Sequence, residues 1–291
     1  MNQHFVSRRE MVNVRLAKLA SDASAPAVLR APLEKAITSP GKRVRGVLTM
    51  TVGEAFGAKS AALVDAAAAF ELIHASSLIL DDLPCMDDAE LRRGEPALHR
   101  AFGEDLAVLA AVALLNESYA LISSSHAALK PRRWPLSALI ERVVNAVGWD
   151  GTIGGESVDL HCEAETLDFH TLEYIHSRKT GALFVASAAI GAMLAAASDA
   201  MLRSVEAYAK NLGLAFQITD DILDATSSTA ELGKDVGKDE GKLTFVRLAG
   251  VDGARQLNRE LIETSIRAIQ PLGRAAAPLA ALATMLRDRT S

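Results

Sequence analysis

Three aspartates with the character of metal ligands lie in one short segment, residues 78–94, which reads LILDDLPCMDDAELRRG. Asp81 and Asp82 end an apolar run of helical character, and Asp87 follows after Pro84. The proline predicts that the helix ends near Asp81. Negative charge is poorly placed at that end of a helix, so a cation must compensate the carboxylates. Oxygen ligands without a paired His or Cys favour a hard ion such as Mg²⁺, which binds a few carboxylates together with substrate phosphates.

A second aspartate cluster lies in residues 217–225, QITDDILDA. Asp220 and Asp224 are four residues apart on an apolar helical segment and share one face, whereas Asp221 points about a quarter turn away. Because the flanking residues are apolar, we expect the carboxylates to face a cavity rather than bulk water. Like charges at this spacing also require a compensating cation.

Four basic segments contain glycine: 41–46 (GKRVRG), 91–94 (LRRG), 178–181 (RKTG) and 233–242 (GKDVGKDEGK). Arginine binds pairs of oxygens through its guanidinium, and glycine lets the backbone approach a ligand. Each segment alone is typical of a solvated surface. Together with two carboxylate clusters, they indicate a diphosphate held through Mg²⁺. Neither GxxxxGK[ST] nor GxGxxG occurs, which argues against the usual nucleotide-binding loops.

The composition favours a helical protein with a large core. The 291 residues are 49% hydrophobic but only 4% aromatic, and alanine is abundant, which favours close-packed helices. A net charge of -5 argues against nucleic acid or an anionic membrane as a partner. The only cysteines are Cys85 and Cys162, and the amino end has no apolar signal core, so we expect a cytoplasmic protein.

The elements that position these residues are predicted to be helices. Apolar residues recur at helical spacing in 44–56, 61–82, 104–122, 136–147, 181–197 and 204–224. No run of alternating strand residues, solenoid repeat or flexible linker interrupts them, so we predict one domain over 1–291. Residues 61–80 contain Asp65, Glu71 and His74, and residues 181–199 are rich in alanine, glycine and serine. We therefore expect core helices and no membrane span.

With these motifs in this order, the chain resembles the short-chain trans-prenyl diphosphate synthases, and most closely the bacterial geranylgeranyl diphosphate synthases of carotenoid pathways. The resemblance runs from about residue 39 to 246. It includes the segments ELIHASSLILDD (71–82), HSRKTGALF (176–184), FQITDDILD (216–224) and LGKDVGKDEGKLT (232–244). It implies an all-α, single-domain bundle of long, mostly antiparallel helices around a central cavity, of the isoprenoid synthase type and usually a homodimer.

The resemblance also assigns roles residue by residue. The expected metal ligands are Asp81, Asp82, Asp87, Asp220, Asp221 and Asp224. Arg92 is expected to contact the allylic diphosphate, and the expected isopentenyl diphosphate contacts are Lys42, Arg45, His74 and Arg93. The residues expected beside the allylic substrate and the developing cation are Lys179, Thr180, Gln217 and Lys234.

The implied reaction is the head-to-tail condensation of isopentenyl diphosphate with an allylic diphosphate (dimethylallyl, geranyl or farnesyl), with Mg²⁺ as cofactor. The departing pyrophosphate would be stabilised by Mg²⁺ and basic side chains. The isopentenyl double bond would then attack the allylic cation. Thr180 and Gln217 can direct oxygen dipoles at this cation, and the released pyrophosphate is the expected base.

Product length in such enzymes depends on the residues one turn before the first aspartates. Here these residues are Ser76 and Ser77, which are small where short-product enzymes tend to have an aromatic residue. We therefore predict geranylgeranyl diphosphate as the product. Farnesyl diphosphate, formed by the same chemistry, is the alternative.

The chain departs from the family's usual pattern at several positions. Gly46 and Val246 stand where proline is common, Leu80 where many relatives have histidine, and Val112 where many have aspartate. Glu156, in GGESVDL, replaces a usual glutamine. This added carboxylate could alter the metal balance or pair with a basic residue.

Two other interpretations keep the helices but change the function. Residues 71–74 (ELIH) and 173–176 (EYIH) are both Glu-x-x-His, as in di-iron helical bundles, but a di-iron site leaves the aspartate clusters unexplained. A terpene cyclase or an inactive partner subunit would share the fold. The presence of Lys42, Arg45 and Arg93 together argues against a cyclase, which needs no isopentenyl site.

Overall fold

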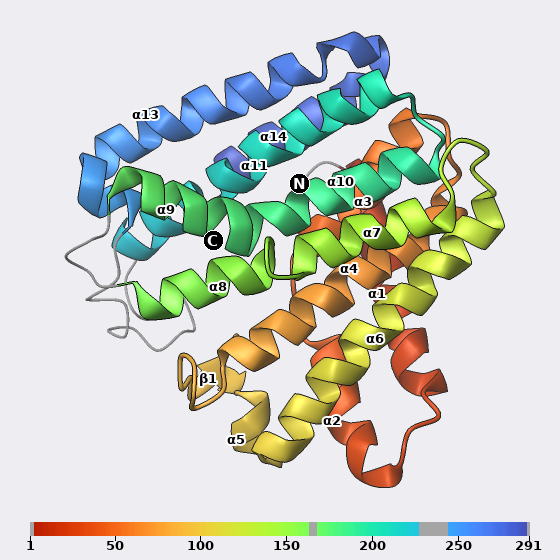
Figure 1. Ribbon diagram of the computed structural model, residues 1–291, viewed down its shortest axis with the longest axis vertical. Coiled ribbons are helices and arrows are strands. Elements are labelled where there is room, and N and C mark those ends of the chain that lie inside the picture. Colours follow the sequence, from red (N-terminus) through yellow and green to blue (C-terminus); the bar gives the residue numbers. More distant parts are fainter. Residues whose placement is uncertain (1–2, 163–167, 227–243, 290–291) are drawn as a thin grey trace.

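The structure, a computed structural model, describes residues 3–162, 168–226 and 244–289. It is mostly helical, which confirms the all-α prediction (Figure 1). Its helices are α1 (Gln3–Asp22), α2 (Ala27–Thr38), α3 (Val44–Ala55), α4 (Ser60–Asp81), α5 (Leu98–Phe102), α6 (Glu104–Leu129), α7 (Leu136–Val147), α8 (Thr152–His161), α9 (Phe169–His176), η1 (Ser177–Gly181), α10 (Ala182–Leu194), α11 (Asp199–Thr226), α13 (Phe245–Ala268), η2 (Gln270–Ala276) and α14 (Ala277–Arg287). Two short strands, β1 (Leu91–Arg92) and β2 (Glu95–Pro96), form one antiparallel hairpin.

The helices expected from apolar periodicity are present as α3, α4, α6, α7, α10 and α11. Helix α4 ends at Asp81, as the following Pro84 predicts. Helix α6 continues seven residues beyond the predicted end at 122, to Leu129, where Lys130 adopts a left-handed conformation. The apolar periodicity identified neither the helices at both ends of the chain nor α8 and α9.

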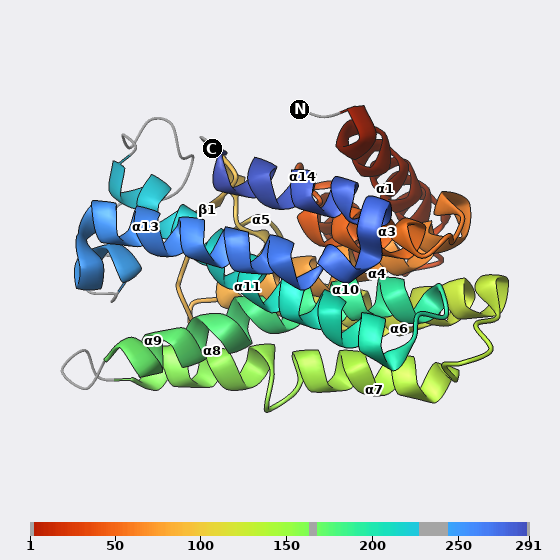
Figure 2. The same ribbon diagram turned by 90° about the horizontal axis from the view of Figure 1, so that it is seen from above.

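Helix α10 lies at the centre of the bundle, and nearly all of its residues from Leu183 to Leu194 are buried. It packs against α3, α7 and α11. Gly191 makes the contact with α3 close, because a Cβ atom there would be 2.4 Å from the carbonyl oxygen of Thr49. Figure 2 shows α13 and α14 on one side of α10 and α11, and α7, α8 and α9 on the other. The expectation that residues 181–199 form a core helix is confirmed by the burial of α10.

Two helices, α4 and α6, are long and apolar enough to cross a membrane by length and composition. Core helices of soluble proteins pass the same test. Helix α4 is 61% buried over its most apolar window, and it carries the polar residues Glu71 and His74. Helix α6 is 39% buried over the corresponding window and presents apolar side chains outward. Burial in the bundle therefore accounts for the apolar character of α4, whereas part of the apolar surface of α6 is exposed in the described part of the chain.

Candidate active site

A cavity of about 450 Å³ brings the two aspartate clusters together. Its wall includes the carboxyl end of α4, the loop that follows, and parts of α8, α9, η1 and α11. Five of the six predicted aspartates line it, together with Asp159: Asp81, Asp87, Asp220, Asp221 and Asp224. The basic and polar residues that line it include Arg45, His74, Arg92, Arg93, Lys179, Thr180 and Gln217. Most of the predicted site residues therefore line one cavity.

A tight loop after α4 returns Asp87 to the first aspartate. The backbone N–H of Asp87 donates to the carbonyl oxygen of Asp81 at 2.9 Å. The next residue, Asp88, has a φ of 46° and donates its N–H to the carbonyl oxygen of Leu83 at 3.0 Å. Left-handed backbone of this kind is tolerated by aspartate better than by most residues. Asp81 at the helix end and Asp87 in the loop are thus held on the same side of the cavity.

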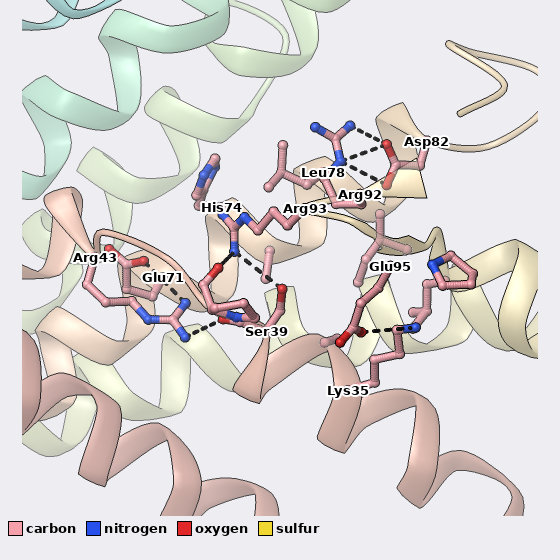
Figure 3. Close-up of a pocket in the computed structure, with 16 residues that line it drawn as sticks. Lys35, Ser39, Arg43, Glu71, His74, Leu78, Asp82, Arg92, Arg93 and Glu95 are labelled. Carbon is pink, nitrogen blue, oxygen red and sulfur yellow. Dashed lines mark hydrogen bonds and ion pairs between the residues drawn. The ribbon is translucent and has the colours of Figure 1, made fainter. Parts of the chain in front are cut away.

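Asp82 is separated from the other five aspartates. It is 3% exposed, and its carboxylate accepts hydrogen bonds from Nε of Arg92 at 3.0 and 3.1 Å and a further one from Nη2. It lines a smaller neighbouring pocket of about 60 Å³ (Figure 3) rather than the main cavity. The sequence placed Asp82 among the metal ligands, but its contact in the structure is that of a counter-ion that orients Arg92.

The smaller pocket in Figure 3 shares His74, Leu78, Arg92 and Arg93 with the main cavity. Arg93 reaches across it to the hydroxyl of Ser39 and the carbonyl oxygen of Pro40. Of the residues predicted to bind isopentenyl diphosphate, His74 and Arg93 line both the pocket and the main cavity, and Arg45 lines the main cavity. Lys42 is exposed on the loop before α3 and, in the part of the chain that the structure describes, lines neither compartment.

The π-helical turn η1 presents Lys179 to the cavity. π-helical turns occur frequently at functional sites. Nζ of Lys179 lies 2.6 Å from a carboxylate oxygen of Glu156 and 2.7 Å from one of Asp159, both on α8. Burial alone would lower the pKa of Lys179, but these two carboxylates outweigh it and raise the pKa. Lys179 is therefore a fixed positive charge. The sequence reasoning did not identify Asp159, which follows Glu156 by one helical turn.

A chain of hydrogen bonds connects η1, α11 and the start of α13. The hydroxyl of Thr180 donates to Oε1 of Gln217 at 3.1 Å, and Nε2 of Gln217 donates to Oδ1 of Asp221 at 3.2 Å. Oδ2 of Asp221 accepts the backbone N–H of Phe245 at 3.0 Å. The amide of Gln217 is thereby held in one orientation, so Thr180 and Gln217 have defined positions at the cavity wall.

Arg289, near the carboxyl end of the chain, contacts the second aspartate cluster and was not predicted. Its Nη2 donates to Asp220 at 2.6 Å and to the carbonyl oxygen of Phe216 at 2.9 Å, and its guanidinium lies 4.0 Å above the Phe216 ring. Phe216 also packs on Phe184, over which Arg45 lies. Two guanidiniums therefore contact a pair of aromatic rings next to Asp220. No motif in the sequence connects residue 289 with residue 220.

Burial changes the protonation of several groups in the cavity. Burial first, and the charges of Glu156 and Asp87 after it, raise the pKa of Asp81 to about 7. Burial also raises the pKa of Asp221 to about 6. Burial and the surrounding arginines lower the pKa of His74 well below its usual value, and burial lowers that of His176 to about 4. Both histidines are therefore neutral at pH 7.

These shifts predict a pH dependence of metal binding. Asp81 and Asp221 bind protons more tightly when folded, so their contribution to stability is present below about pH 4 and is lost as pH rises through 6 to 7. A metal cation such as Mg²⁺ competes with the proton for the carboxylate of Asp81. A pKa of about 7 for Asp81 makes the apparent Mg²⁺ affinity about tenfold lower at pH 6 than at pH 8. Calorimetric titration at the two pH values measures this difference, and equal affinities would contradict it.

The carboxylates of the cavity fit Mg²⁺ better than they fit a metal held by protein alone. In the described ranges, no group of three or more His, Cys, Asp or Glu side chains is placed to hold an ion by itself. Mg²⁺ usually keeps waters and takes one or two carboxylates together with substrate phosphates. The di-iron alternative also loses a ligand, because Glu71 accepts the N–H of Gly46 at 2.9 Å and lies near Arg43.

The two serines assigned to product length lie differently. Ser77 is partly buried and lines the main cavity. Ser76 is 3% exposed and donates its hydroxyl to the carbonyl oxygen of Ala111 on α6 at 2.8 Å. Ser76 therefore faces the packing between α4 and α6 rather than the cavity. Lys234, the remaining predicted residue, lies outside the described residues.

Comparisons with known proteins agree with this arrangement. Residues 26–275 match the family model described as polyprenyl synthetase. The chain is 39% identical to the putative geranylgeranyl pyrophosphate synthase 8, chloroplastic, of Arabidopsis thaliana, over 98% of this chain and 81% of that protein. A solved geranyltransferase from Legionella pneumophila superposes with a TM-score of 0.85 at 30% identity, covering 99% of this chain and 96% of that one.

A geranyltransferase from Helicobacter pylori, solved in complex with magnesium and isoprenyl diphosphate, has a TM-score of 0.82 at 27% identity and covers 98% of this chain and 97% of that one. The fold and the shared cavity define a helical isoprenyl diphosphate synthase. The chain belongs to the polyprenyl synthetase family and is a short-chain prenyltransferase. Enzymes of this family act on isopentenyl diphosphate and allylic diphosphates and use Mg²⁺.

Proposed function

We propose that this chain condenses isopentenyl diphosphate with an allylic diphosphate in a Mg²⁺-dependent reaction and releases geranylgeranyl diphosphate. The observation that carries the proposal is that five carboxylates from two distant segments share one cavity with Lys179, Thr180 and Gln217. The C20 product is supported by the small side chain of Ser77 at the cavity wall and by the names of the relatives. Farnesyl diphosphate remains the alternative, because several similar solved structures are geranyltransferases or farnesyl diphosphate synthases.

The cavity has the groups that such a reaction needs. Asp81 and Asp87 on one wall and Asp220 and Asp224 on the other would hold Mg²⁺. When bound there, Mg²⁺ supplies Lewis-acid stabilisation of the leaving pyrophosphate. Lys179 adds a fixed positive charge to bind the allylic diphosphate, as a preorganised electrostatic group.

The other residues orient the second substrate and protect the cation. Arg92, fixed by Asp82, extends the anion site from the opposite wall. Arg45 and Arg93, with the neutral ring of His74 between two compartments, would bind the isopentenyl diphosphate. Thr180 and Gln217 direct oxygens at the developing cation without attacking it. The released pyrophosphate accepts the proton lost after condensation.

Product analysis tests this function directly. Pure enzyme is incubated with Mg²⁺, labelled isopentenyl diphosphate and each of dimethylallyl, geranyl and farnesyl diphosphate, and the products are dephosphorylated and sized. We expect a C20 product that disappears when EDTA is added. A C15 product would support the farnesyl alternative, and no condensation with any of the three primers would contradict the proposed reaction.

We further propose that the enzyme is a homodimer that associates through α6, α7 and α8. Exposed apolar side chains gather on these consecutive helices and on the turn between α7 and α8: Val108, Leu109, Val112, Val144, Trp149 and Ile153. Trp149 is 85% exposed. Large apolar side chains on a surface of this kind are typical of protein interfaces. A second copy would also cover the exposed apolar face of α6.

Substitution at this surface should dissociate the dimer. Trp149→Glu places a charge where we expect a buried aromatic contact, so light scattering coupled to size-exclusion chromatography should report a monomer. Val14→Glu is the matched control, because Val14 is 60% exposed on α1, which packs against α2, α3 and α4. A wild-type monomer, or a Trp149→Glu dimer as stable as the control, would contradict the interface.

A further inference from the structure

The α8 wall of the cavity has two carboxylates for one lysine. Glu156 and Asp159 are three residues apart and lie on the same face of α8. Both contact Nζ of Lys179, at 2.6 and 2.7 Å, and the side chain of Glu156 is only 11% exposed. Among the residues that the structure describes, Lys179 is the cation that contacts them, so two carboxylates share one ammonium and one negative charge is left over in a largely buried place.

This arrangement is held by direct backbone packing. Gly155 precedes Glu156, and a Cβ atom at Gly155 would lie 2.4 Å from the backbone nitrogen of Lys179 and 2.8 Å from Cβ of Arg178. No side chain fits between the two elements, so α8 and η1 touch through their backbones. Glu156 cannot leave Lys179 without a change of side-chain rotamer or a separation of these elements.

The uncompensated charge lies at the wall of the cavity. Lys179 and Asp159 line the cavity together with Asp81 and Asp87. Glu156 contacts the same ammonium of Lys179 at 2.6 Å, so its charge changes the balance of charge at this wall from neutral to negative. A neutral amide at position 156 would leave Lys179 and Asp159 as a balanced pair and would remove this influence.

We propose that Glu156 is a positioning residue that holds Lys179 against α8 and, through its charge, favours the binding of divalent cations over that of diphosphates in the cavity. A net negative charge at the cavity wall attracts Mg²⁺ and repels pyrophosphate oxygens. With the glutamine that is usual in the enzymes the chain resembles, the wall would be neutral. This inference rests on the proposed function for the identity of the two ligands.

Glu156→Gln tests the charge with little change in shape. Calorimetric titration of Mn²⁺ into the substrate-free variant should give a Kd about three- to tenfold higher than in the wild type. The KM for the allylic diphosphate should fall in the same variant. Both differences should shrink at about 1 M salt, because they are electrostatic. Glu34→Gln, which removes an exposed charge from α2, is the control and should change neither constant.

The direction of the two changes distinguishes this role from a structural one. Loss of packing would weaken both ligands, so weaker binding of both, or no change in either, overturns the proposal. Glu156→Asp keeps the charge, so its Kd for Mn²⁺ should be within about twofold of the wild-type value. A loss of Mn²⁺ affinity as large as that of Glu156→Gln would also overturn the proposal. If the wild type condenses no prenyl diphosphates but the Mn²⁺ difference is present, the proposed function fails and the role of Glu156 in cation binding stands.

Discussion

Asp81→Ala and Asp220→Ala are each expected to lower kcat by several orders of magnitude. The two residues line one cavity from different helices, α4 and α11, so each substitution removes a carboxylate of a different aspartate cluster from the expected metal site. Loss of one preorganised electrostatic group costs on the order of 10²–10³ in rate. A divalent cation concentrates more charge than one hydrogen-bond donor, so we expect losses beyond that range. Steady-state rates with labelled isopentenyl diphosphate measure them.

The contacts of the two aspartates determine how the variants are interpreted. Asp220 accepts a hydrogen bond from Arg289, and its removal leaves a largely buried guanidinium without that partner. Asp81 sits in a buried place that raises its pKa, so Asp81→Asn keeps the shape and should fold at least as stably. Asp81→Asn is therefore the sharper variant. A normal melting temperature with near-normal turnover in Asp81→Asn would contradict the metal assignment.

The helical fold and the composition of the cavity could be predicted, because both depend on patterns within short segments. Apolar residues at helical spacing located α4 and α11, and Pro84 located the end of α4. The order of the aspartate and basic motifs then indicated that the two helices share a ligand. This inference needed no knowledge of how the helices cross.

The contacts that could not be predicted depend on which residues meet across the bundle. Asp82 and Asp81 are neighbours in sequence, but only the fold decides that Asp82 turns to Arg92. Arg289 reaches Asp220 only because α14 packs against α11, and no local pattern records that packing. The position of Asp159 one helical turn after Glu156 was visible in the sequence, but its contact with Lys179 on η1 was not.

Which of the two serines, Ser76 or Ser77, faces the cavity also depends on how helices pack and could not be derived from the sequence. Helix α4 is apolar nearly all round, so its sequence contains no polar face from which its rotation about its axis could be derived. A difference of one residue, about 100° around a helix, decides which serine faces the cavity. The structure resolves this: Ser77 lines the cavity, and Ser76 packs against α6.

Ser77→Phe is therefore expected to shift the product from C20 to C15. A phenyl ring at this position would project into the part of the cavity that the growing prenyl product occupies. The shorter space would then end elongation earlier. Ser77→Ala, which keeps the space, should leave the C20 product unchanged. The products are dephosphorylated and separated by chromatography from single incubations with geranyl diphosphate and isopentenyl diphosphate. An unchanged C20 fraction in Ser77→Phe would contradict the assignment of this residue to chain length.

Ser76→Phe provides the contrast that makes this prediction specific to the cavity. Its side chain would have to enter the close packing of α4 on α6, where Ser76 donates to Ala111. Overpacking of this kind costs about 1–3 kcal/mol in the free energy of unfolding. We expect a lower Tm with a C20 product in the folded fraction. A product shift in Ser76→Phe as large as that in Ser77→Phe would mean that the space between α4 and α6, rather than the cavity wall, limits chain growth.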